Sequence, residues 1–393
     1  MNTVNTKVRV GMIGGGEGAF IGAVHRCAAA LDGKIDLVCG AFSRDTANNR
    51  RTGDALGLAS DRLYDSWQAL IEQEVQRAPA DRMDMLTIVT PNHLHVPIAE
   101  AALAAGFHVF SEKPAATSLA EAQHLADTLQ KSGCLYGLAH TYLGYPMVWQ
   151  AREMVRDGIL GNLRKIYVEY PQGWLSENQE QQGNKQAAWR SDPALAGASG
   201  CMADIGTHAF GLAEFITGQK ITHVCAELAT HVPGRQLDDD GAALFRTQGG
   251  ASGVLIASQV CVGEENALKI RLYGDKGGVE WRQMEPNSLM YRALGEPLRI
   301  LRAGVDQPGL SGEALRRCRL PGGHPEGYLE AMGNLYRDFA AAIRSDEASN
   351  GEAPGTATGV PGISAGLRGM AFIEAMVASQ TSNTKWIQLA DVG

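Results

Sequence analysis

The sequence contains no long apolar run, no low-complexity tract and no internal repeat. A membrane-spanning helix needs about 20 consecutive apolar residues, and no stretch of this chain approaches that length. The first residues, Met1 to Lys7, are too few and too polar for a signal peptide. We therefore expect a soluble, cytoplasmic protein without a membrane partner.

Cysteine is sparse and shows no pairing pattern. The 7 cysteines are scattered along the chain, and no C-x-x-C pair occurs. Zinc sites and disulfide frameworks depend on such spacings, so we expect neither a metal nor disulfides. Scattered free cysteines are typical of a reducing cytoplasm.

Positive charge is also limited. Lys and Arg number 35 against 43 Asp and Glu, which gives a net charge of −8. This balance argues against a broad nucleic-acid surface, so we expect no nucleic-acid partner. The remaining composition, 45% hydrophobic and 20% charged, is that of an ordinary globular protein. A chain of 393 residues can form two domains that each bury a core.

The first structured stretch combines a strand, a glycine-rich turn and a helix. Val8–Ile13 has the pattern of a buried strand, and residues 19–31 carry a helical apolar pattern. Glycines between them let the backbone approach a pyrophosphate, and the helix N-terminus offers unpaired N–H groups. We therefore expect a dinucleotide site, although such turns also use glycine for structural reasons alone. The candidate cofactor-binding glycines are Gly14, Gly16, Gly18 and Gly22.

Strands and helices alternate from this turn to about residue 140. Such alternation predicts a parallel, doubly wound sheet, which is an α/β Rossmann domain over residues 1–140. Between residues 221 and 290, strand-like segments follow one another without intervening helices. Consecutive strands indicate an antiparallel sheet. We place this sheet in a second α/β domain over residues 141–393.

The end of the second predicted strand bears on the choice of cofactor. In Rossmann domains a residue about 20 positions past the glycines contacts the adenosine ribose. Here the hydroxyl of Ser43 and the cation of Arg44 suit a 2′-phosphate, so of NAD and NADP we weakly favour NADP. Asp45 comes slightly late for this role, and its alternative role is to cap the next helix.

The next strand end carries Thr90, Pro91, Asn92 and His95, which are candidates for contact with the cofactor. The structural alternative is that Asn92 caps the following helix and Pro91 sets a turn. Metal binding by the histidines of this segment is disfavoured, because no third ligand accompanies them at a useful spacing.

The segment Phe110–Ala115 ends another strand. Pro114 has no N–H to give to a sheet, so the strand stops there. Glu112 and Lys113 thereby lie at the carboxyl end of a strand, where open α/β sheets bind their ligands. We expect both to contact the cofactor, and Lys113 also the substrate. The alternative is an ion pair at a strand terminus.

Asp204 and His208 are four positions apart, so a helix stacks them on one face. A carboxylate beside a histidine raises the imidazole pKa and fixes its orientation, as acid–base catalysis requires. Trp189 and Arg190, just upstream, suit a polyhydroxylated ligand. The alternatives are an Asp–His pair on a helix surface and a Trp189 that belongs to the core.

Taken together, these segments resemble the Gfo/Idh/MocA family of oxidoreductases along essentially the whole chain. The family motifs T-P-N-x-x-H and E-K-P match residues 90–95 and 112–114. Further matches are Gly158-Ile-Leu-Gly161, Trp189-Arg190, Asp204-Ile-Gly-Thr-His208 and His324-Pro-Glu-Gly-Tyr328.

The chain departs from the family pattern at two places. The turn I-G-x-G-x-x-G-x-x-H is three residues longer here, because Ile13 and His25 are 25 − 13 = 12 positions apart. Leu143 stands where the family often has an arginine, three residues before Pro146.

The resemblance implies a Rossmann domain followed by an α/β domain whose large, open, mostly antiparallel sheet forms homodimers or homotetramers. It also implies an NAD(P)-dependent dehydrogenase or reductase acting on a ring carbinol of a sugar, sugar derivative or inositol. Lys113, Asp204 and His208 would be catalytic, and with Trp189 and Arg190 they would bind the substrate. In this hypothesis the nicotinamide lies beside the ring carbon between Lys113, which orients the hydroxyl, and His208, which carries the proton.

Two other functions stay open at this point. One is a cofactor-binding regulator without catalysis, since a fold does not fix a function. The other is a glycosidase that uses tightly held NAD for transient oxidation.

Overall fold

The computed structural model describes residues 7–345 and 359–392, without the side chains of residues 185 and 186. The chain divides into two compact units. Of the described residues, the first unit holds 7–116, 120–139, 332–345 and 359–366, and the second holds 117–119, 140–331 and 367–392. Residues 332–345, which the sequence analysis placed in the second domain, thus pack with the first.

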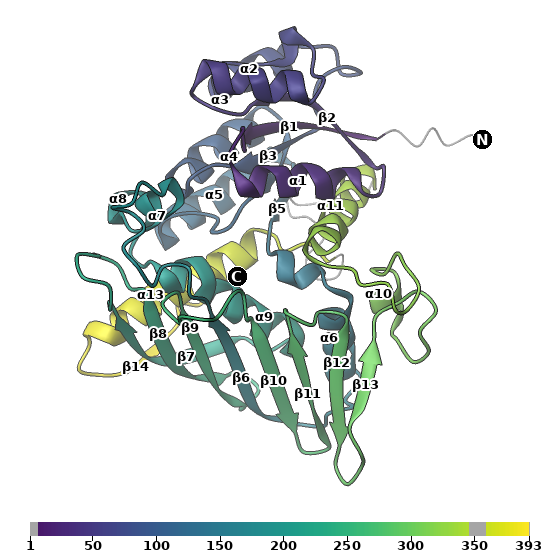
Figure 1. Ribbon diagram of the computed structural model, residues 1–393, viewed down its shortest axis with the longest axis vertical. Coiled ribbons are helices and arrows are strands. Elements are labelled where there is room, and N and C mark those ends of the chain that lie inside the picture. Colours follow the sequence, from purple (N-terminus) through teal and green to yellow (C-terminus); the bar gives the residue numbers. More distant parts are fainter. Residues whose placement is uncertain (1–6, 346–358, 393) are drawn as a thin grey trace. The chain divides into compact units, whose positions relative to one another are not determined.

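The first unit is built on a parallel five-stranded sheet in the order β2-β1-β3-β4-β5 (Figure 1). Its strands are β1 (Val8–Gly14), β2 (Ile35–Ala41), β3 (Met85–Val89), β4 (His108–Ser111) and β5 (Tyr136–Leu138). All four pairings are parallel, which confirms the predicted Rossmann sheet. The strand order reverses between β1 and β3, and open parallel sheets bind ligands at such a switch point.

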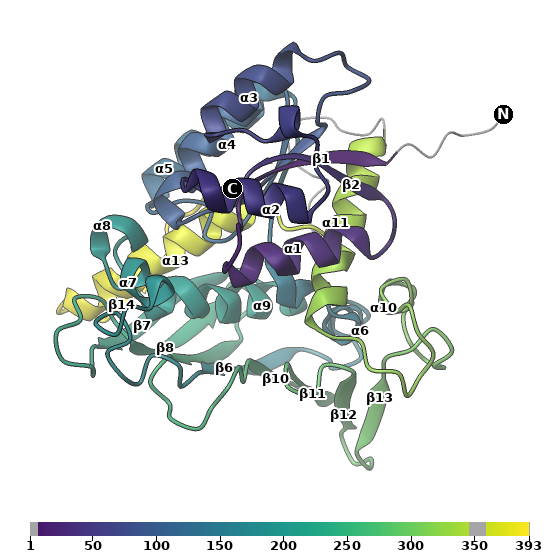
Figure 2. The same ribbon diagram turned by 45° about the horizontal axis from the view of Figure 1, so that its top comes forward.

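Helices cover both faces of this sheet. They are α1 (Phe20–Ala30), α2 (Thr46–Ala55), α3 (Trp67–Gln76), α4 (His95–Ala104), α5 (Leu119–Ser132) and most of α11 (Tyr328–Arg344), with the short 3-10 turns η1 (Ser60–Arg62) and η2 (Asn92–Leu94). Helix α4 packs against β3 and β4, and α5 lies beside it in both views (Figures 1 and 2). Helices α1 and α11 share a hydrophobic cluster with β1.

Helix α11 completes the core of the first unit. Its buried face carries Met332, Leu335, Tyr336 and Phe339, which belong to one cluster with Phe110 of β4. The amphipathic sequence of α11 predicts such a face, but it does not say which core the face covers. Only packing in three dimensions assigns this C-terminal helix to the N-terminal sheet.

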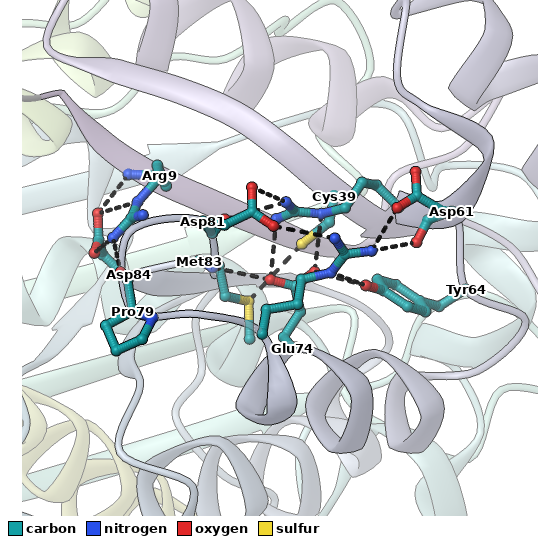
Figure 3. Close-up of polar contacts among 11 residues, drawn as sticks. Arg9, Cys39, Asp61, Tyr64, Glu74, Pro79, Asp81, Met83 and Asp84 are labelled. Carbon is teal, nitrogen blue, oxygen red and sulfur yellow. Dashed lines mark hydrogen bonds and ion pairs between the residues drawn. The ribbon is translucent and has the colours of Figure 1, made fainter.

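A buried carboxylate ties α3 to η1, to the residues that follow η1 and to the segment before β3 (Figure 3). Glu74 is fully buried and accepts hydrogen bonds from Tyr64 Oη at 2.6 Å, Met83 N at 2.9 Å and Arg62 Nη2 at 3.0 Å. Arg77 adds a second cation 3.4 Å from the same carboxylate. The charge is therefore paired and hydrogen-bonded, which is the condition under which a buried ion is tolerated.

The second unit contains a nine-stranded sheet in the order β13-β12-β11-β10-β6-β9-β8-β7-β14. Its strands are β6 (Leu163–Pro171), β7 (Ile221–Ala229), β8 (Asp240–Thr247), β9 (Ser252–Ser258), β10 (Lys269–Gly274), β11 (Gly277–Arg282), β12 (Ser288–Ala293), β13 (Arg299–Arg302) and β14 (Trp386–Gln388). Strands β6 and β9 run parallel and the other pairings are antiparallel, so the sheet is mixed and mostly antiparallel, as predicted.

Helices pack on one face of this sheet, and the other face is open. Helices α6 (Pro146–Arg156) and α9 (Thr207–Thr217) pack against the strands and each other (Figure 1). Along β8 buried and exposed residues alternate, as a half-covered strand requires. Other helical segments are η3 (Thr141–Gly144), α7 (Lys185–Arg190), α8 (Pro193–Ala196), α10 (Gly312–Leu315) and α13 (Ile363–Thr381), whose first turn belongs to the first unit.

Two local features of the second unit concern its predicted site residues. The polar stretch 173–190, which includes Trp189 and Arg190, ends in the short helix α7. The helix predicted to carry Asp204 and His208 begins as a π-helical turn, η4 (Met202–Gly206), and continues as α9. No helix in the described part of the chain is long and apolar enough to cross a membrane.

Candidate active site

The predicted cofactor-binding residues of the first unit gather at one edge of its parallel sheet. Strands β1, β3 and β4 are neighbours, and their carboxyl ends carry Gly14, Thr90 and Glu112 respectively. The parallel direction of the strands is the reason, because it brings all carboxyl ends to the same edge.

The glycines of the turn differ in how closely neighbouring atoms approach them. A Cβ on Gly14 would lie 2.5 Å from the carbonyl oxygen of Val89, and one on Gly22 would lie 2.3 Å from the Cα of Gly15. These two glycines let α1 and β3 approach the turn closely. A Cβ on Gly16 would meet Asn48 Oδ1 at 2.4 Å, whereas Gly18 faces open space. Of the four predicted glycines, Gly18 has the most room for a ligand beside it.

The lengthened part of the turn is anchored to α2. Glu17 N donates to Thr52 Oγ1 at 3.0 Å and to Asn48 Oδ1 at 3.1 Å, and Asn48 Nδ2 returns a bond to Glu17 O at 3.0 Å. The Glu17 carboxylate also lies 2.7 Å from Arg51 Nε. Glu17 therefore connects the glycine turn to the helix that follows β2.

The end of β2 confirms the capping role of Asp45. Its carboxylate accepts a hydrogen bond from Asn48 N at 2.9 Å, at the N-terminus of α2. Its own N–H donates to Ser43 Oγ at 3.1 Å. Ser43 is partly buried and Arg44 is exposed, so the cation lies at the surface of this strand end.

In the segment after β3, the structure does not show the helix cap by Asn92 that was the alternative to cofactor binding. Asn92 does not cap α4, because the chain first forms the 3-10 turn η2 and Leu94 takes the N-cap position. His95 is buried, and its ring nitrogens lie 2.7 Å from Pro114 O and 2.9 Å from Thr90 O. Burial lowers the pKa of His95, and the two carbonyl contacts oppose that shift only in part. His95 can thus affect a cofactor through the backbone that it holds.

The E-K-P segment follows β4, which ends at Ser111. Glu112 N donates to Ile88 O at 2.9 Å, so the backbone continues alongside β3. The Glu112 carboxylate accepts from Lys113 N at 3.0 Å and lies 2.9 Å from His25 Nε2. Burial by itself would raise the pKa of Glu112, but the hydrogen bond from His25 and the nearby charge of Lys113 lower it overall.

In the second unit, Asp204 joins two other side chains. Its Oδ2 accepts from Gln259 Nε2 at 2.9 Å and lies 3.3 Å from Arg190 Nε. Arg190 in turn stacks on Trp189, with the guanidinium carbon 4.2 Å from the ring centroid. Three predicted substrate residues, Trp189, Arg190 and Asp204, are therefore linked. Trp189 is only partly buried, so it is not a core residue.

His208 lies in the first turn of α9 among aromatic rings. Its centroid is 4.8 Å from that of Tyr142, 5.5 Å from His140 and 6.2 Å from Tyr170. The surroundings leave His208 8% exposed. The sequence analysis missed these neighbours, although His140 and Tyr142 lie shortly after β5, on either side of the predicted domain boundary.

A polar network extends from these tyrosines. The hydroxyls of Tyr142 and Tyr170 contact each other, and Tyr170 Oη also donates to Asn266 Oδ1 at 2.5 Å. Gln172 Nε2 donates to the same oxygen at 2.7 Å. Burial raises the pKa of both tyrosines far above the ordinary value, so their hydroxyls keep their protons. The network offers uncharged donors and acceptors rather than a second charged site.

Among the described residues, no group of three or more His, Cys, Asp or Glu side chains is arranged to hold a metal ion. All seven cysteines are free thiols.

Two protein families match this chain. Residues 8–140 match the oxidoreductase family with an NAD-binding Rossmann fold, and residues 148–280 match the GFO/IDH/MocA C-terminal domain. An uncharacterized oxidoreductase of Bacillus subtilis (strain 168), YfiI, is 31% identical over 388 residues, which cover 98% of each chain.

Relatives with a stated activity are also similar. Levoglucosan dehydrogenase of Pseudarthrobacter phenanthrenivorans is 26% identical over 70% of this chain and 73% of its own. An inositol dehydrogenase homolog from Azotobacter vinelandii, solved with NAD+, has a TM-score of 0.91 at 35% identity, covering 98% of this chain and 97% of its own. An inositol dehydrogenase homolog from the same organism, solved with NADH and myo-inositol, has a TM-score of 0.88 at 33% identity, covering 98% of both chains.

Proposed function

The chain belongs to the Gfo/Idh/MocA family of oxidoreductases, and on that premise we propose that it transfers a hydride between nicotinamide and a ring carbinol of a sugar, sugar derivative or inositol. The observation that carries the proposal is the position of Lys113. It follows β4 at the sheet edge that also carries the glycine turn and Thr90. The inositol dehydrogenase homolog and the levoglucosan dehydrogenase support this class of substrate.

The first unit fits a dinucleotide at this edge. The N-cap residue of α1 is Ala19, whose side chain cannot cap the helix, so the first N–H groups can hold a pyrophosphate. Gly18 leaves open space beside the turn. Thr90 Oγ1 is buried and has no hydrogen-bond partner among the described residues, which suits a ligand polar group. When bound, the nicotinamide supplies the hydride acceptor or donor.

In this proposal each catalytic side chain has a separate task. The ammonium of Lys113 orients the reacting hydroxyl and stabilises the alkoxide charge that develops as the C–H bond breaks. His208 takes the hydroxyl proton. Asp204, held by Gln259 and Arg190, binds substrate hydroxyls and orients His208.

We keep both NAD and NADP as candidate cofactors. The exposed Arg44 beside Ser43 favours NADP weakly, whereas the similar solved structures contain NAD+ or NADH. Fluorescence titration of both cofactors with wild type and Arg44→Ala decides the question. Tighter binding of NADP than of NAD, weakened by Arg44→Ala, would support the preference for NADP. Tighter binding of NAD, unaffected by Arg44→Ala, would contradict it.

An activity screen tests the function itself. Inositols, free sugars and glycosides are offered with each oxidised cofactor, and the absorbance of reduced nicotinamide is followed, with Lys113→Ala as the inactive control. Reduction by one of these substrates supports the proposal. Tight cofactor binding without reduction by any of them favours a regulator. Glycoside cleavage without net reduction, by protein that keeps its cofactor through purification, favours a glycosidase.

We also propose a cytoplasmic homodimer or homotetramer that associates through the open face of the nine-stranded sheet. Leu244 of β8 and Ile256 of β9 are 50% and 40% exposed on this face, and exposed apolar patches mark association surfaces. Light scattering should give a multiple of the chain mass, and Leu244→Glu with Ile256→Glu should lower it. A monomeric wild type would contradict this assembly.

A further inference from the structure

A continuous chain of hydrogen bonds runs through the interior of the first unit and ends on Lys113. Thr87 Oγ1 lies 3.2 Å from Tyr336 Oη, and Tyr336 Oη lies 2.7 Å from His25 Nδ1. His25 Nε2 lies 2.9 Å from one oxygen of Glu112, and the other oxygen accepts from Lys113 N at 3.0 Å. Thr87, His25 and Tyr336 are fully or almost fully buried.

With His25 neutral, the following assignment of protons satisfies every member of this chain of hydrogen bonds. Ionised Glu112 only accepts, so His25 must donate to it from Nε2 and Lys113 must donate from its backbone N–H. With its proton on Nε2, His25 presents a lone pair at Nδ1, which accepts the hydroxyl proton of Tyr336. The Tyr336 oxygen then accepts from Thr87. Tyr336 thereby fixes the tautomer of His25, and His25 fixes the carboxylate.

The residues joined by these hydrogen bonds also pack against one another. The ring of Tyr336 lies 4.6 Å from that of Phe110, and the ring of His25 lies 5.7 Å from that of Tyr336. Phe110 belongs to β4, the strand that leads into Glu112. Replacing the hydroxyl of Tyr336 alone would leave this packing intact while removing the donor to His25.

A second histidine holds the other side of Lys113. His95 contacts the carbonyl oxygen of Pro114 at 2.7 Å, so the residues before and after Lys113 are both tied to buried imidazoles. The backbone of Lys113 is therefore fixed on both flanks.

We infer that Tyr336, through His25 and Glu112, is a positioning residue for Lys113. The effect on hydride transfer rests on the proposed function, whereas the effect on the backbone of Lys113 does not. Tyr336 comes from α11, 311 positions beyond His25 along the chain, and no motif of the sequence points to it. The C-terminal segment thus supplies part of the machinery that holds the catalytic lysine.

The test compares Tyr336→Phe with Tyr64→Phe. Both variants delete one buried hydroxyl in the same unit, but Tyr64 donates to Glu74, away from the chain that ends on Lys113. Hydrogen exchange is measured by mass spectrometry on the peptide that contains Lys113. We expect exchange in Tyr336→Phe to be about tenfold faster than in wild type, the scale of one lost buried hydrogen bond, and unchanged in Tyr64→Phe. Equal exchange in the two variants would overturn the inference.

Single-turnover hydride transfer gives the catalytic readout. We expect Tyr336→Phe to slow transfer by about tenfold or more, the scale of a small misplacement of a catalytic group, with cofactor affinity unchanged. A wild-type rate in Tyr336→Phe would remove the catalytic part of the inference. A wild type without activity on any substrate would refute the proposed function, while hydrogen exchange still decides the role of Tyr336.

Glu112→Gln provides a second variant if Tyr336→Phe does not fold. The glutamine keeps the shape of Glu112, but it removes the negative charge that accepts from both His25 and Lys113 N–H, and its NH2 group cannot accept from either. We expect faster exchange of the Lys113 peptide in this variant too. Wild-type protection in Glu112→Gln would show that the carboxylate does not hold the lysine.

Discussion

Replacing Lys113 by alanine is the most direct test of the proposed chemistry. The side chain is partly buried at the sheet edge, and its backbone N–H is the group that donates to Glu112. That bond survives in Lys113→Ala, and so do the contacts of the glycine turn. We therefore expect the variant to fold and to bind the dinucleotide with nearly unchanged affinity.

The effect on hydride transfer should be large. Removing one preorganised donor that stabilises a developing charge costs a factor of about 100 to 1,000 in rate, and the lower bound corresponds to about 2.7 kcal/mol of transition-state stabilisation. We expect at least the lower bound, because hydrogen bonds on both sides already fix the backbone of Lys113. Ordering this backbone therefore does not reduce the stabilisation of the transition state. Lys113→Arg should not restore the rate, because the planar guanidinium differs in shape from the compact ammonium and cannot take its position beside the reacting hydroxyl.

The assay pairs cofactor titration with single-turnover hydride transfer in stopped flow. Wild type, Lys113→Ala and Lys113→Arg are compared at saturating cofactor, so that a loss of binding cannot imitate a loss of chemistry. Transfer in Lys113→Ala within a few-fold of the wild-type rate would move the catalytic centre elsewhere and refute the mechanism.

Three further predictions concern other charged groups. Asp204→Asn should lower kcat and shift the pH–rate profile, because it removes the charge that faces Arg190; an unchanged rate and profile would make Asp204 structural. Glu74→Ala should lower the free energy of unfolding by about 3–5 kcal/mol, since it leaves the buried Arg62 without this partner; chemical denaturation measures this, and a loss below about 1 kcal/mol would contradict it. The folded pKa of Glu112 lies below the ordinary 4.5, so its contribution to stability is complete above that pH and is lost as the pH falls through the folded pKa. Denaturation at several acidic pH values should therefore show a shallower decline in Glu112→Gln than in wild type, and parallel curves would count against this role.

Local patterns in the sequence determined most of the first unit. The strand, glycine turn and helix at residues 8–30 and the strand end at Pro114 depend on neighbours in the chain, so they can be predicted from them. The direction of parallel strands then places Thr90 and Lys113 on the same edge without any further information. The mostly antiparallel second sheet followed from consecutive strands in the same way.

Interactions between distant residues could not be predicted. The spacing of Asp204 and His208 suggested one regular helix, but the chain forms a π-helical turn there, and Asp204 contacts Gln259 and Arg190. Local periodicity cannot foresee this, because the partners of Asp204 are 55 and 14 positions away.

Helix α11 shows the same limit at the scale of a whole element. Its sequence determined that it is an amphipathic helix, but its sequence does not indicate which sheet the helix covers. Only the tertiary structure brings Tyr336 to His25 and thus connects the C-terminal segment to Lys113. The physical reason is that burial of an apolar face is nondirectional and can be satisfied by any core of the right shape, whereas a hydrogen bond between two particular atoms exists only after that core has formed.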